Sequence, residues 1–452
     1  MSCVGASSSF SFSIPGTEGA QAMSKLAHNL FSCFARTFSS WALAIKNASS
    51  PRKALHLYSQ MHRRSIPYDT FSILFTLKCC TSLHNLNIIR HLHSHIFKIG
   101  FATHVYVATS LLHGYVVVSL DDACRLFDEM PEKNSVTWNT MLSGFAKSGD
   151  INSARQVFDA IPLRNVDSWS AMIAGYVSNG KYDSGLACFR DMMSDEGSKP
   201  DQITLGSVLS GCAQMGSLGL LMGRSVHGFV VKNGWELNVE IGTVLVDMYS
   251  RCGFLKCACR VFDLMPARNV ITWTALICGS AQHGYSKEAL SMFELMQEMG
   301  VRPNEFAFTG VLSACARTGL VEEGRKYFKM IEHYGLKPRI QHYGCMVDLF
   351  GKAGLLDEAY QVIRTMELEP NVVIWGSFLS ACKEHKNFEM AGRVIEQVLR
   401  TIKPDKDGGV FSLISDLYVL NEKWDDAGWI RKLMVNQSVR KARGSSFIDY
   451  KK

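Results

Sequence analysis

Five tryptophans recur along this chain, and nearly the same residues follow three of them. Trp138, Trp169 and Trp273 open the segments WNTMLSGFAKSG, WSAMIAGYVSNG and WTALICGSAQHG, while Trp41 and Trp375 open weaker copies. Copies of the longer unit lie about 100 residues apart, and each interval divides into three sub-repeats of about 30 to 37 residues. A period of this length predicts an all-α solenoid of stacked helix pairs, in which each repeat packs only on its neighbours.

One sub-repeat, residues 135–165, illustrates the local pattern. Its first half places four apolar side chains at helical spacing, namely Trp138, Met141, Leu142 and Phe145. Gly149 stands where a first helix is expected to end, and Asp150 or Asn152 can cap a second helix. That second helix is expected to bury Ala154 and Phe158, a small and a large side chain that pack together. These apolar positions indicate core, and no cofactor is implied.

Applied along the chain, the pattern predicts ten repeats between a leader and a C-terminal domain. The leader comprises residues 1–37 and the C-terminal domain residues 372–452. The repeats are 38–69, 70–104, 105–134, 135–165, 166–201, 202–238, 239–269, 270–304, 305–339 and 340–371.

The leader differs in composition from the rest of the chain. It is rich in serine, has Glu18 as its one acidic residue, and lacks a charged start followed by an apolar stretch. This composition predicts an organelle transit peptide rather than a secretory signal. A basic amphipathic stretch from Met23 favours the mitochondrion, and the serine-rich start favours the chloroplast. A disordered tail without function is the third interpretation.

Composition and charge limit the classes of protein that fit. Hydrophobic residues make up 47% of the chain, yet no run of about 18 apolar residues predicts a membrane span. The net charge of +7 permits a polyanionic partner without requiring one.

The 14 cysteines are expected to be reduced and structural. Four of them share one repeat position, where a small apolar side chain lets two helices approach: Cys80, Cys212, Cys315 and Cys382. A denser group, Cys252, Cys257 and Cys259, has neither C-x-x-C spacing nor suitably placed histidines. No metal site is therefore predicted.

Two polar positions in each repeat do not fit the core pattern. The first is a small polar residue inside an otherwise apolar first helix, at Thr109, Asn139, Ser170, Thr243 and Thr274. The second is the last residue of the repeat, at Asn134, Asn165, Asp201, Asn269 and Asn304. In a regular stack these positions form a ladder whose side chains can meet successive base edges of a single strand. Alternatively, the terminal Asn or Asp caps the next helix, and both roles can hold together.

At these residues the chain resembles the plant pentatricopeptide repeat proteins, in the subfamily that alternates ordinary, long and short repeats. The segments VTWNTMLSGFAKSG, EALSMFELMQEMGVRPN and GVLSACARTGLVEEGRKYF carry the resemblance, which covers residues 38–452. It implies a right-handed α-solenoid of about ten motifs that binds single-stranded RNA in an organelle. It also implies that the two polar positions read bases, with protein and RNA running parallel from 5′ to 3′.

Residues 372–452 resemble the E domain that follows the repeats in RNA-editing factors. Its two halves are VVIWGSFLSACKEHKNFEMAGRVIEQVLR and DLYVLNEKWDDAGWIRKLMVNQSVRKARGSSFIDYKK. Some editing factors continue into a DYW-type zinc deaminase, whose chemistry needs H-x-E and P-C-x-x-C, and neither motif occurs here. The resemblance therefore implies a monomeric, non-enzymatic specificity factor for C-to-U editing. Its expected partners are a DYW-type deaminase in trans and the multiple organellar RNA editing factors.

The family's code, carried over residue by residue, implies a target sequence. Thr109 with Asn134 implies A, Asn139 with Asn165 a pyrimidine, and Ser170 with Asp201 G. Thr243 with Asn269 and Thr274 with Asn304 imply A and A. Three pairs imply no base: Gly206 with Asn238, Thr309 with Arg339, and Gly344 with Asn371. The implied element is 5′-A-Y-G-N-A-A-N-N, with the edited C a few nucleotides downstream.

Two departures from the family's pattern limit the code. The first repeat is about three residues short and has Ala42 where a polar residue belongs, so no base is assigned to it. The repeat 105–134 lacks a residue before Leu120, which can shift its register.

Three other functions fit parts of the pattern. The chain can serve RNA splicing, stability or translation without editing, or act as a protein-interaction scaffold. An acid–base site at Asp425 and Asp426, or at His342 beside Tyr343, is the enzymatic alternative. A helix cap or a solvated face is the simpler interpretation of those residues.

Overall fold

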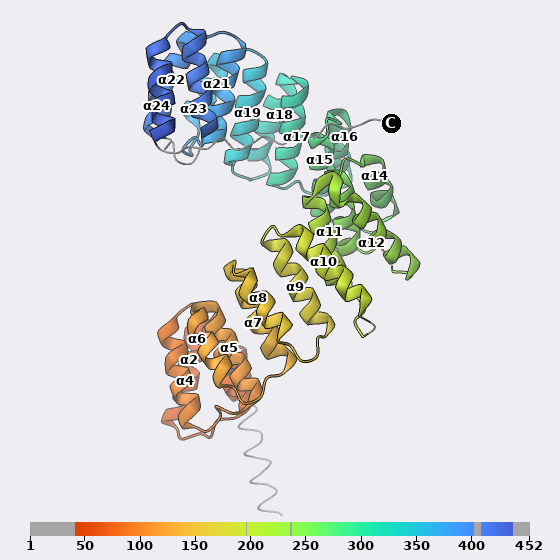
Figure 1. Ribbon diagram of the computed structural model, residues 1–452, viewed down its shortest axis with the longest axis vertical. Coiled ribbons are helices and arrows are strands. Elements are labelled where there is room, and N and C mark those ends of the chain that lie inside the picture. Colours follow the sequence, from red (N-terminus) through yellow and green to blue (C-terminus); the bar gives the residue numbers. More distant parts are fainter. Residues whose placement is uncertain (1–40, 196, 236, 402–407, 437–452) are drawn as a thin grey trace, which may run out of the picture. The chain divides into compact units, whose positions relative to one another are not determined.

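The computed structural model describes residues 41–195, 197–235, 237–401 and 408–436, so the predicted leader 1–37 lies outside the described residues. All regular structure in these ranges is helical, which confirms the all-α prediction (Figure 1). The chain divides into two compact units, residues 1–204 and 205–452, and each is described by itself.

The first unit consists of antiparallel helix pairs. Its first helices are residues 41–46, α3 (Thr70–Thr81), α5 (Val105–Val118), α7 (Ser135–Ser148) and α9 (Val166–Ser178). Its second helices are α2 (Pro51–Arg63), α4 (Leu86–Lys98), α6 (Leu120–Glu129), α8 (Ile151–Asp159) and α10 (Tyr182–Ser194).

The second unit continues the same alternation. Its first helices are α11 (Gln202–Gln214), which begins in the first unit, α13 (Val239–Arg251), α15 (Val270–Gln282), α17 (Glu305–Thr318), α19 (Ile340–Lys352), α21 (Val372–Glu384) and α23 (Gly408–Leu420). Its second helices are α12 (Leu220–Lys232), α14 (Leu255–Leu264), α16 (Ser286–Glu298), α18 (Val321–His333), α20 (Leu356–Thr365), α22 (Phe388–Thr401) and α24 (Trp424–Asn436), with a 3₁₀ turn η1 (Gly216–Gly219) before α12.

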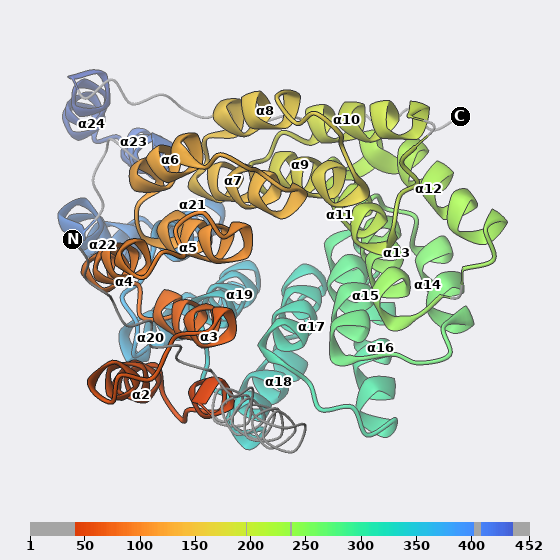
Figure 2. The same cartoon turned by 90° about the horizontal axis from the view of Figure 1, so that it is seen from below.

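Within each unit the helices form two layers. First helices pack side by side, as α5, α7 and α9 do in the first unit and α13, α15, α17 and α19 in the second. Second helices form the other layer: α8 and α10 lie above α7 and α9 in the view of Figure 2 and contact them. This neighbour-to-neighbour packing is that of an α-solenoid, as predicted.

Local sequence fixes where the helices begin and end. Asn134 caps α7 by accepting the backbone N–H of Thr137, and Asp150 caps α8 by accepting that of Ser153. Gly149 ends α7 in the left-handed conformation with φ of 89°, which a residue with a side chain adopts at a cost. The predicted roles of Gly149 and Asp150 are thus confirmed.

The core lies between the two layers and confirms the predicted apolar positions. Trp169 and Trp273 are buried, and each meets the phenylalanine of the preceding second helix edge to face. The ring centroids of Phe262 and Trp273 are 4.7 Å apart. The four cysteines at the shared repeat position are fully buried, and burial raises the pKa of their thiols to about 12: Cys80, Cys212, Cys315 and Cys382.

The missing residue before Leu120 makes the α5–α6 turn unusually tight. Ser119 is both the last cap of α5 and the first cap of α6, where it accepts the backbone N–H of Asp122. The missing residue shortens this turn. Thr109 lies before the turn, in α5, and keeps its contact with the next repeat.

Candidate nucleic-acid interface

The two polar positions of a repeat meet in space. In four of the five pairs, the fifth residue of a first helix contacts the residue that caps the following first helix, either directly or through one further hydroxyl. We call the fifth residue and that cap residue a reading pair. The pair Thr274 and Asn304 is in direct contact: the Thr274 hydroxyl lies 3.2 Å from Asn304 Oδ1 and 2.7 Å from the Val270 carbonyl oxygen, and its one hydrogen is available to either acceptor. The two residues are 30 positions apart in sequence, so the contact depends on the stacking of α15 on α17.

In the first unit, a third residue bridges the pair of Thr109 and Asn134. The Thr137 hydroxyl lies 2.9 Å from the Thr109 hydroxyl and donates to Asn134 Oδ1, also at 2.9 Å. Thr109 additionally donates to the carbonyl of Val105, one turn earlier in α5. Its buried hydroxyl is therefore satisfied inside the protein.

The pair of Ser170 and Asp201 is built in the same way. Thr204 Oγ1 lies 2.5 Å from Ser170 Oγ and donates to Asp201 Oδ1 at 2.6 Å. Ser170 Oγ also lies 3.5 Å from that carboxylate oxygen. Two hydroxyls thus converge on one oxygen of the carboxylate.

In the second unit, Thr243 and Asn269 are joined through Thr272. The Thr272 hydroxyl lies 2.6 Å from that of Thr243 and donates to Asn269 Oδ1 at 3.0 Å. Sequence reasoning missed this bridging residue, the third of a first helix. The sequence carried a signal for it, because Thr137, Thr204 and Thr272 each stand two residues before the fifth residue of their own first helix.

The pair of Asn139 and Asn165 differs from the others. Ser168, the residue at the bridging place, bonds only within its own helix start, to Asn165. Asn139 Oδ1 is buried and has no hydrogen-bond partner among the described residues. These two asparagines hold the expected sequence positions, but no hydrogen bond links them among the described residues.

The capping role of the terminal Asn or Asp is confirmed as well. Asn134, Asn165, Asn269 and Asn304 each accept a backbone N–H at the start of the next first helix, and Asp201 accepts that of Thr204. Because Oδ1 accepts this bond in each asparagine, the amide edge carrying Nδ2 is the part left to meet a ligand at Asn134, Asn269 and Asn304, whereas Nδ2 of Asn165 donates to Asp167 at 3.4 Å.

A row of exposed apolar side chains flanks the reading pairs, and sequence reasoning missed it too. These residues occupy the second place of their first helices, three residues before the fifth place and therefore on the same helix face. They are 59% to 70% exposed: Phe71, Tyr106, Val136, Ile203, Ile271, Phe306 and Val373. The same place holds Asp167 in α9, Glu240 in α13 and Gln341 in α19, so the apolar residue recurs in several repeats of each unit rather than in all of them. Such recurrence indicates a surface for a flat apolar ligand group.

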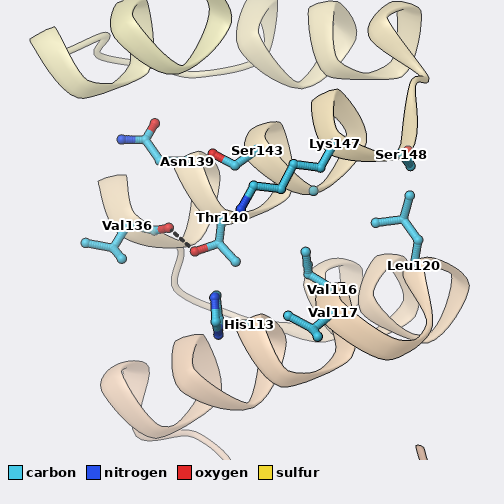
Figure 3. Close-up of a pocket in the computed structure, with 11 residues that line it drawn as sticks. His113, Val116, Val117, Leu120, Val136, Asn139, Thr140, Ser143, Lys147 and Ser148 are labelled. Carbon is cyan, nitrogen blue, oxygen red and sulfur yellow. Dashed lines mark hydrogen bonds between the residues drawn. The ribbon is translucent and has the colours of Figure 1, made fainter. Parts of the chain in front are cut away.

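Two cavities in the first unit open on this face. One, of about 670 Å³, has Thr109 and Asn134 in its wall together with Tyr106, Val136 and Lys78. The other, of about 610 Å³, contains Asn139 in its wall (Figure 3).

Cationic groups reach the same two cavities. Lys147 and His113 line the second cavity, and their side chains lie on either side of Thr140 in Figure 3. Burial, and after it the Lys147 ammonium, lower the pKa of His113 below its ordinary value. Lys78 and Lys147 therefore supply the positive charge of this face near neutral pH.

The residues considered for acid–base chemistry have structural places. His342 is fully buried, where its Nδ1 accepts the N–H of Arg339 and its Nε2 donates to the carbonyl of Glu305 at 2.7 Å. Asp425 and Asp426 lie exposed in the first turn of α24, where carboxylates favour the helix N-terminus.

Among the described residues, no group of three His, Cys, Asp or Glu side chains is arranged to hold a metal ion. Likewise, none of the helices in the described ranges is long and apolar enough to cross a bilayer.

Comparison with known proteins identifies the repeats. The PPR repeat model matches residues 136–166, 167–196, 243–270, 306–336 and 342–369, and the PPR repeat family model matches residues 268–317. In a solved structure of the pentatricopeptide repeat protein PPR10 from maize, bound to an 18-nucleotide psaJ RNA element, the fold is similar, with a TM-score of 0.69 at 14% identity. That match covers 90% of this chain and 62% of the PPR10 chain.

Curated relatives from Arabidopsis thaliana are more similar in sequence. The chloroplastic pentatricopeptide repeat-containing protein CRR2 is 34% identical over 90% of this chain and 58% of its own length. A mitochondrial pentatricopeptide repeat-containing protein is 37% identical over 92% of this chain and 60% of its own, so the chain spans less than two thirds of either relative. Another is 36% identical over 88% of this chain and 74% of its own length. The chain belongs to the family of plant pentatricopeptide repeat proteins.

Proposed function

We propose that this chain binds single-stranded RNA in sequence-specific fashion, with one base facing each reading pair. The observation that carries the proposal is the repeated juxtaposition of a hydroxyl, a capping Asn or Asp, and an exposed apolar side chain on one helix face. A polar pair can meet the edge of a base while the apolar side chains cover its flat faces. PPR10, whose fold is similar, was solved with an RNA element, which supports this choice of ligand.

The bonding of the Thr and Asn pairs accounts for a preference for adenine. Thr109 donates its hydrogen within the protein, so its oxygen can only accept from a ligand, whereas Asn134 offers the Nδ2 donor. Adenine presents an amino donor beside a ring-nitrogen acceptor, which complements that pair. Guanine presents a carbonyl and an N–H at those places, so it does not complement this pair. We propose the same base for Thr243 with Asn269 and for Thr274 with Asn304.

The pair of Ser170 and Asp201 presents two acceptors. The Ser170 hydroxyl donates to the carbonyl of Val166, and the Asp201 carboxylate offers acceptor oxygens. Guanine offers two adjacent donors, its N1–H and its amino group, whereas the ring nitrogen of adenine would oppose the carboxylate. We propose guanine at this place.

The full target follows the order of the pairs along the chain. With a pyrimidine at Asn139 and Asn165, and no assignment for the pair of Gly206 and Asn238, the element is 5′-A-Y-G-N-A-A-N-N. The last two places, at Thr309 with Arg339 and at Gly344 with Asn371, are unassigned. Arg339 makes a 2.5 Å ion pair with Glu305, which leaves it poorly placed to select a base.

We further propose that residues 372–452 are an E domain and that the chain is a specificity factor for C-to-U editing in the alternating-repeat subfamily. α21 to α24 supply two more helix pairs in this stretch, and the fifth place of α21 is Gly376, which has no side chain to meet a base. Such a segment suits a protein partner better than a base. We propose that the chain acts as a non-enzymatic monomer together with a DYW-type deaminase in trans and with the multiple organellar RNA editing factors.

The place of action is proposed to be an organelle. Relatives are named chloroplastic or mitochondrial, and the serine-rich leader suits a transit peptide. The mitochondrion remains our first choice because of the basic amphipathic stretch from Met23.

The test of the proposed function has two stages. The recombinant chain should bind RNA carrying the element at least tenfold more tightly than its complement, a difference of about 1.4 kcal/mol. In a plant line lacking the protein, sequencing of organelle RNA should then show loss of C-to-U conversion at sites preceded by such an element. Intact editing with altered splicing or transcript ends would move the function to RNA processing, and absence of RNA binding would favour a protein scaffold.

A further inference from the structure

Three buried threonines stand at the same place in the reading ladder. Thr137, Thr204 and Thr272 are each the third residue of a first helix and each is fully buried. In every case the hydroxyl touches the fifth residue of the preceding first helix and donates to the side-chain oxygen of its own helix cap. The third residue therefore contacts both members of a reading pair.

Counting hydrogens shows what this contact does. The Thr137 hydroxyl has one hydrogen, and it donates that hydrogen to Asn134 Oδ1. This bond and the Thr137 backbone N–H both fall on Asn134 Oδ1, so together they hold the amide with its oxygen toward the helix and its NH₂ group outward. Thr109 must place its own hydrogen on Val105 O or on Thr137 Oγ1, so its outward lone pair is an acceptor. The buried Thr137 hydroxyl thus reinforces the donor and acceptor pattern that a base would meet.

Other repeats of the same chain provide a comparison. Where the fifth residue is Gly206 or Gly344, with no side chain to orient, the third place of the next first helix is Ile241 or Ile374. Where that place is Ala307, the Thr274 hydroxyl lies 3.2 Å from Asn304 Oδ1 without a bridge. Beside the pair of Asn139 and Asn165 the third residue is Ser168, whose hydroxyl contacts Asn165 alone. A bridging hydroxyl is therefore found beside three of the five reading pairs, and in each of these the third residue is a threonine.

We infer that Thr137, Thr204 and Thr272 are positioning residues that determine base specificity through the neighbouring reading pairs. They lie behind those pairs and are buried, so they act on the ligand through another side chain. The inference rests on the proposed RNA binding and deepens it, because it adds a third residue to each reading pair.

The test uses the full chain and short single-stranded RNAs whose affinities are measured by fluorescence anisotropy. One comparison uses the proposed element with either A or G at its first place. A second comparison uses the element with either G or A at its third place. Thr137→Val removes the hydroxyl and preserves the shape, whereas Thr137→Ser keeps the hydroxyl. Thr365→Val is the matched control, since the Thr365 hydroxyl bonds only within α20, to the carbonyl of Gln361.

We expect Thr137→Val to lower the preference for A over G at the first place about fivefold, the value of roughly one hydrogen bond. Its preference at the third place should be unchanged, Thr137→Ser should restore the first preference, and Thr365→Val should match the wild type. An unchanged preference in Thr137→Val, or equal loss of affinity for all RNAs, would overturn the inference while leaving the proposed function standing.

Two further outcomes are also decisive. If the wild-type chain shows no preference between these RNAs, the proposed function fails and the inference with it. If circular dichroism shows that Thr137→Val does not fold, Thr272→Val carries the same test at the fifth place of the element, where Thr243 and Asn269 meet the base.

Discussion

At the scale of single residues, the Asn or Asp of a reading pair has two roles: it caps a helix, and in the proposed function it also meets a base. Asn134 and Asp201 both give Oδ1 to the start of a helix, and so both stabilise the stack. They differ in the other polar atom of the side chain: the Asn134 amide carries the Nδ2 donor, and the Asp201 carboxylate carries a second acceptor oxygen. Exchanging one for the other should therefore alter the ligand's identity while leaving the cap in place.

Asp201→Asn tests that separation. Because the cap oxygen is retained and the outward acceptor becomes a donor, the preference for G over A at the third place should fall about tenfold, toward A. Thermal unfolding should change little. The measurement compares the dissociation constants of the two RNAs, with Asp183→Asn, an exposed change in the first turn of α10, as control. A retained preference for G would show that the carboxylate does not meet the base.

At the scale of helices, small residues let the first helices stack closely enough for the reading pairs to form. Gly279 of α15 faces Ser250 of α13, and a Cβ on Gly279 would lie 2.2 Å from the Ser250 Cβ. The helices cannot both keep their positions with any side chain there.

Gly279→Ala is expected to destabilise the second unit by about 1 to 3 kcal/mol, because the helix pair must move apart. Gly228→Ala in α12 is the matched control, because a Cβ there meets nothing within 4 Å. Since alanine favours a helix more than glycine does, this change should leave the free energy of unfolding unchanged or raise it by up to about 1 kcal/mol. Urea unfolding followed by circular dichroism measures both. Equal stability of the two variants would contradict the close packing.

His342 in α19 hydrogen-bonds to Glu305 in α17, and we expect the stabilisation from this contact to depend on pH. Burial, foremost, lowers the pKa of His342 below its ordinary value of about 6.5. The unfolded chain therefore binds the proton more readily, so the stabilisation is fully present above pH 6.5 and is lost as pH falls toward the folded pKa. Protonation would also remove the acceptor that Nδ1 offers to the Arg339 N–H.

We expect the free energy of unfolding to fall below about pH 6.5, by up to about 1.4 kcal/mol per pH unit for each such histidine. His342→Gln should unfold more easily at pH 7.5 and show a smaller slope between pH 6.5 and 5.5. Between pH 7 and 8 the two curves should run parallel, which serves as the control. An unchanged slope would show that His342 does not gain its proton on unfolding.

Much of the fold followed from the sequence because its signals are local. The periodic apolar residues, the glycine at Gly149 and the cap at Asp150 act within one helix pair, and the structure confirms them. The bridge from Thr109 through Thr137 to Asn134 did not follow, since it depends on how one repeat settles on the next. The exposed apolar residues, such as Tyr106 and Phe306, were missed because a single apolar residue in an amphipathic helix is ordinarily taken for core. The base assignments stay predictions.

At the scale of the whole molecule, charge and repetition together favour a long anionic ligand. The chain carries a net charge of +7, and Lys78 and Lys147 reach the cavities beside the reading pairs. With about one phosphate contact for each of five reading pairs, the logarithm of the RNA affinity should fall with the logarithm of salt concentration with a slope of about −3.5. Affinities measured from 50 to 300 mM potassium chloride test this, and a flat profile would exclude phosphate contacts as a source of binding.

The central claim is that the reading pairs select bases in the order in which they occur along the chain. The most direct measurement is selection of bound sequences from a random single-stranded RNA pool by the full recombinant chain at fixed salt. The account predicts enrichment of A, pyrimidine, G, any base, A and A in that 5′ to 3′ order. Enrichment of an unrelated sequence, or of the element's complement equally with the element, would contradict it.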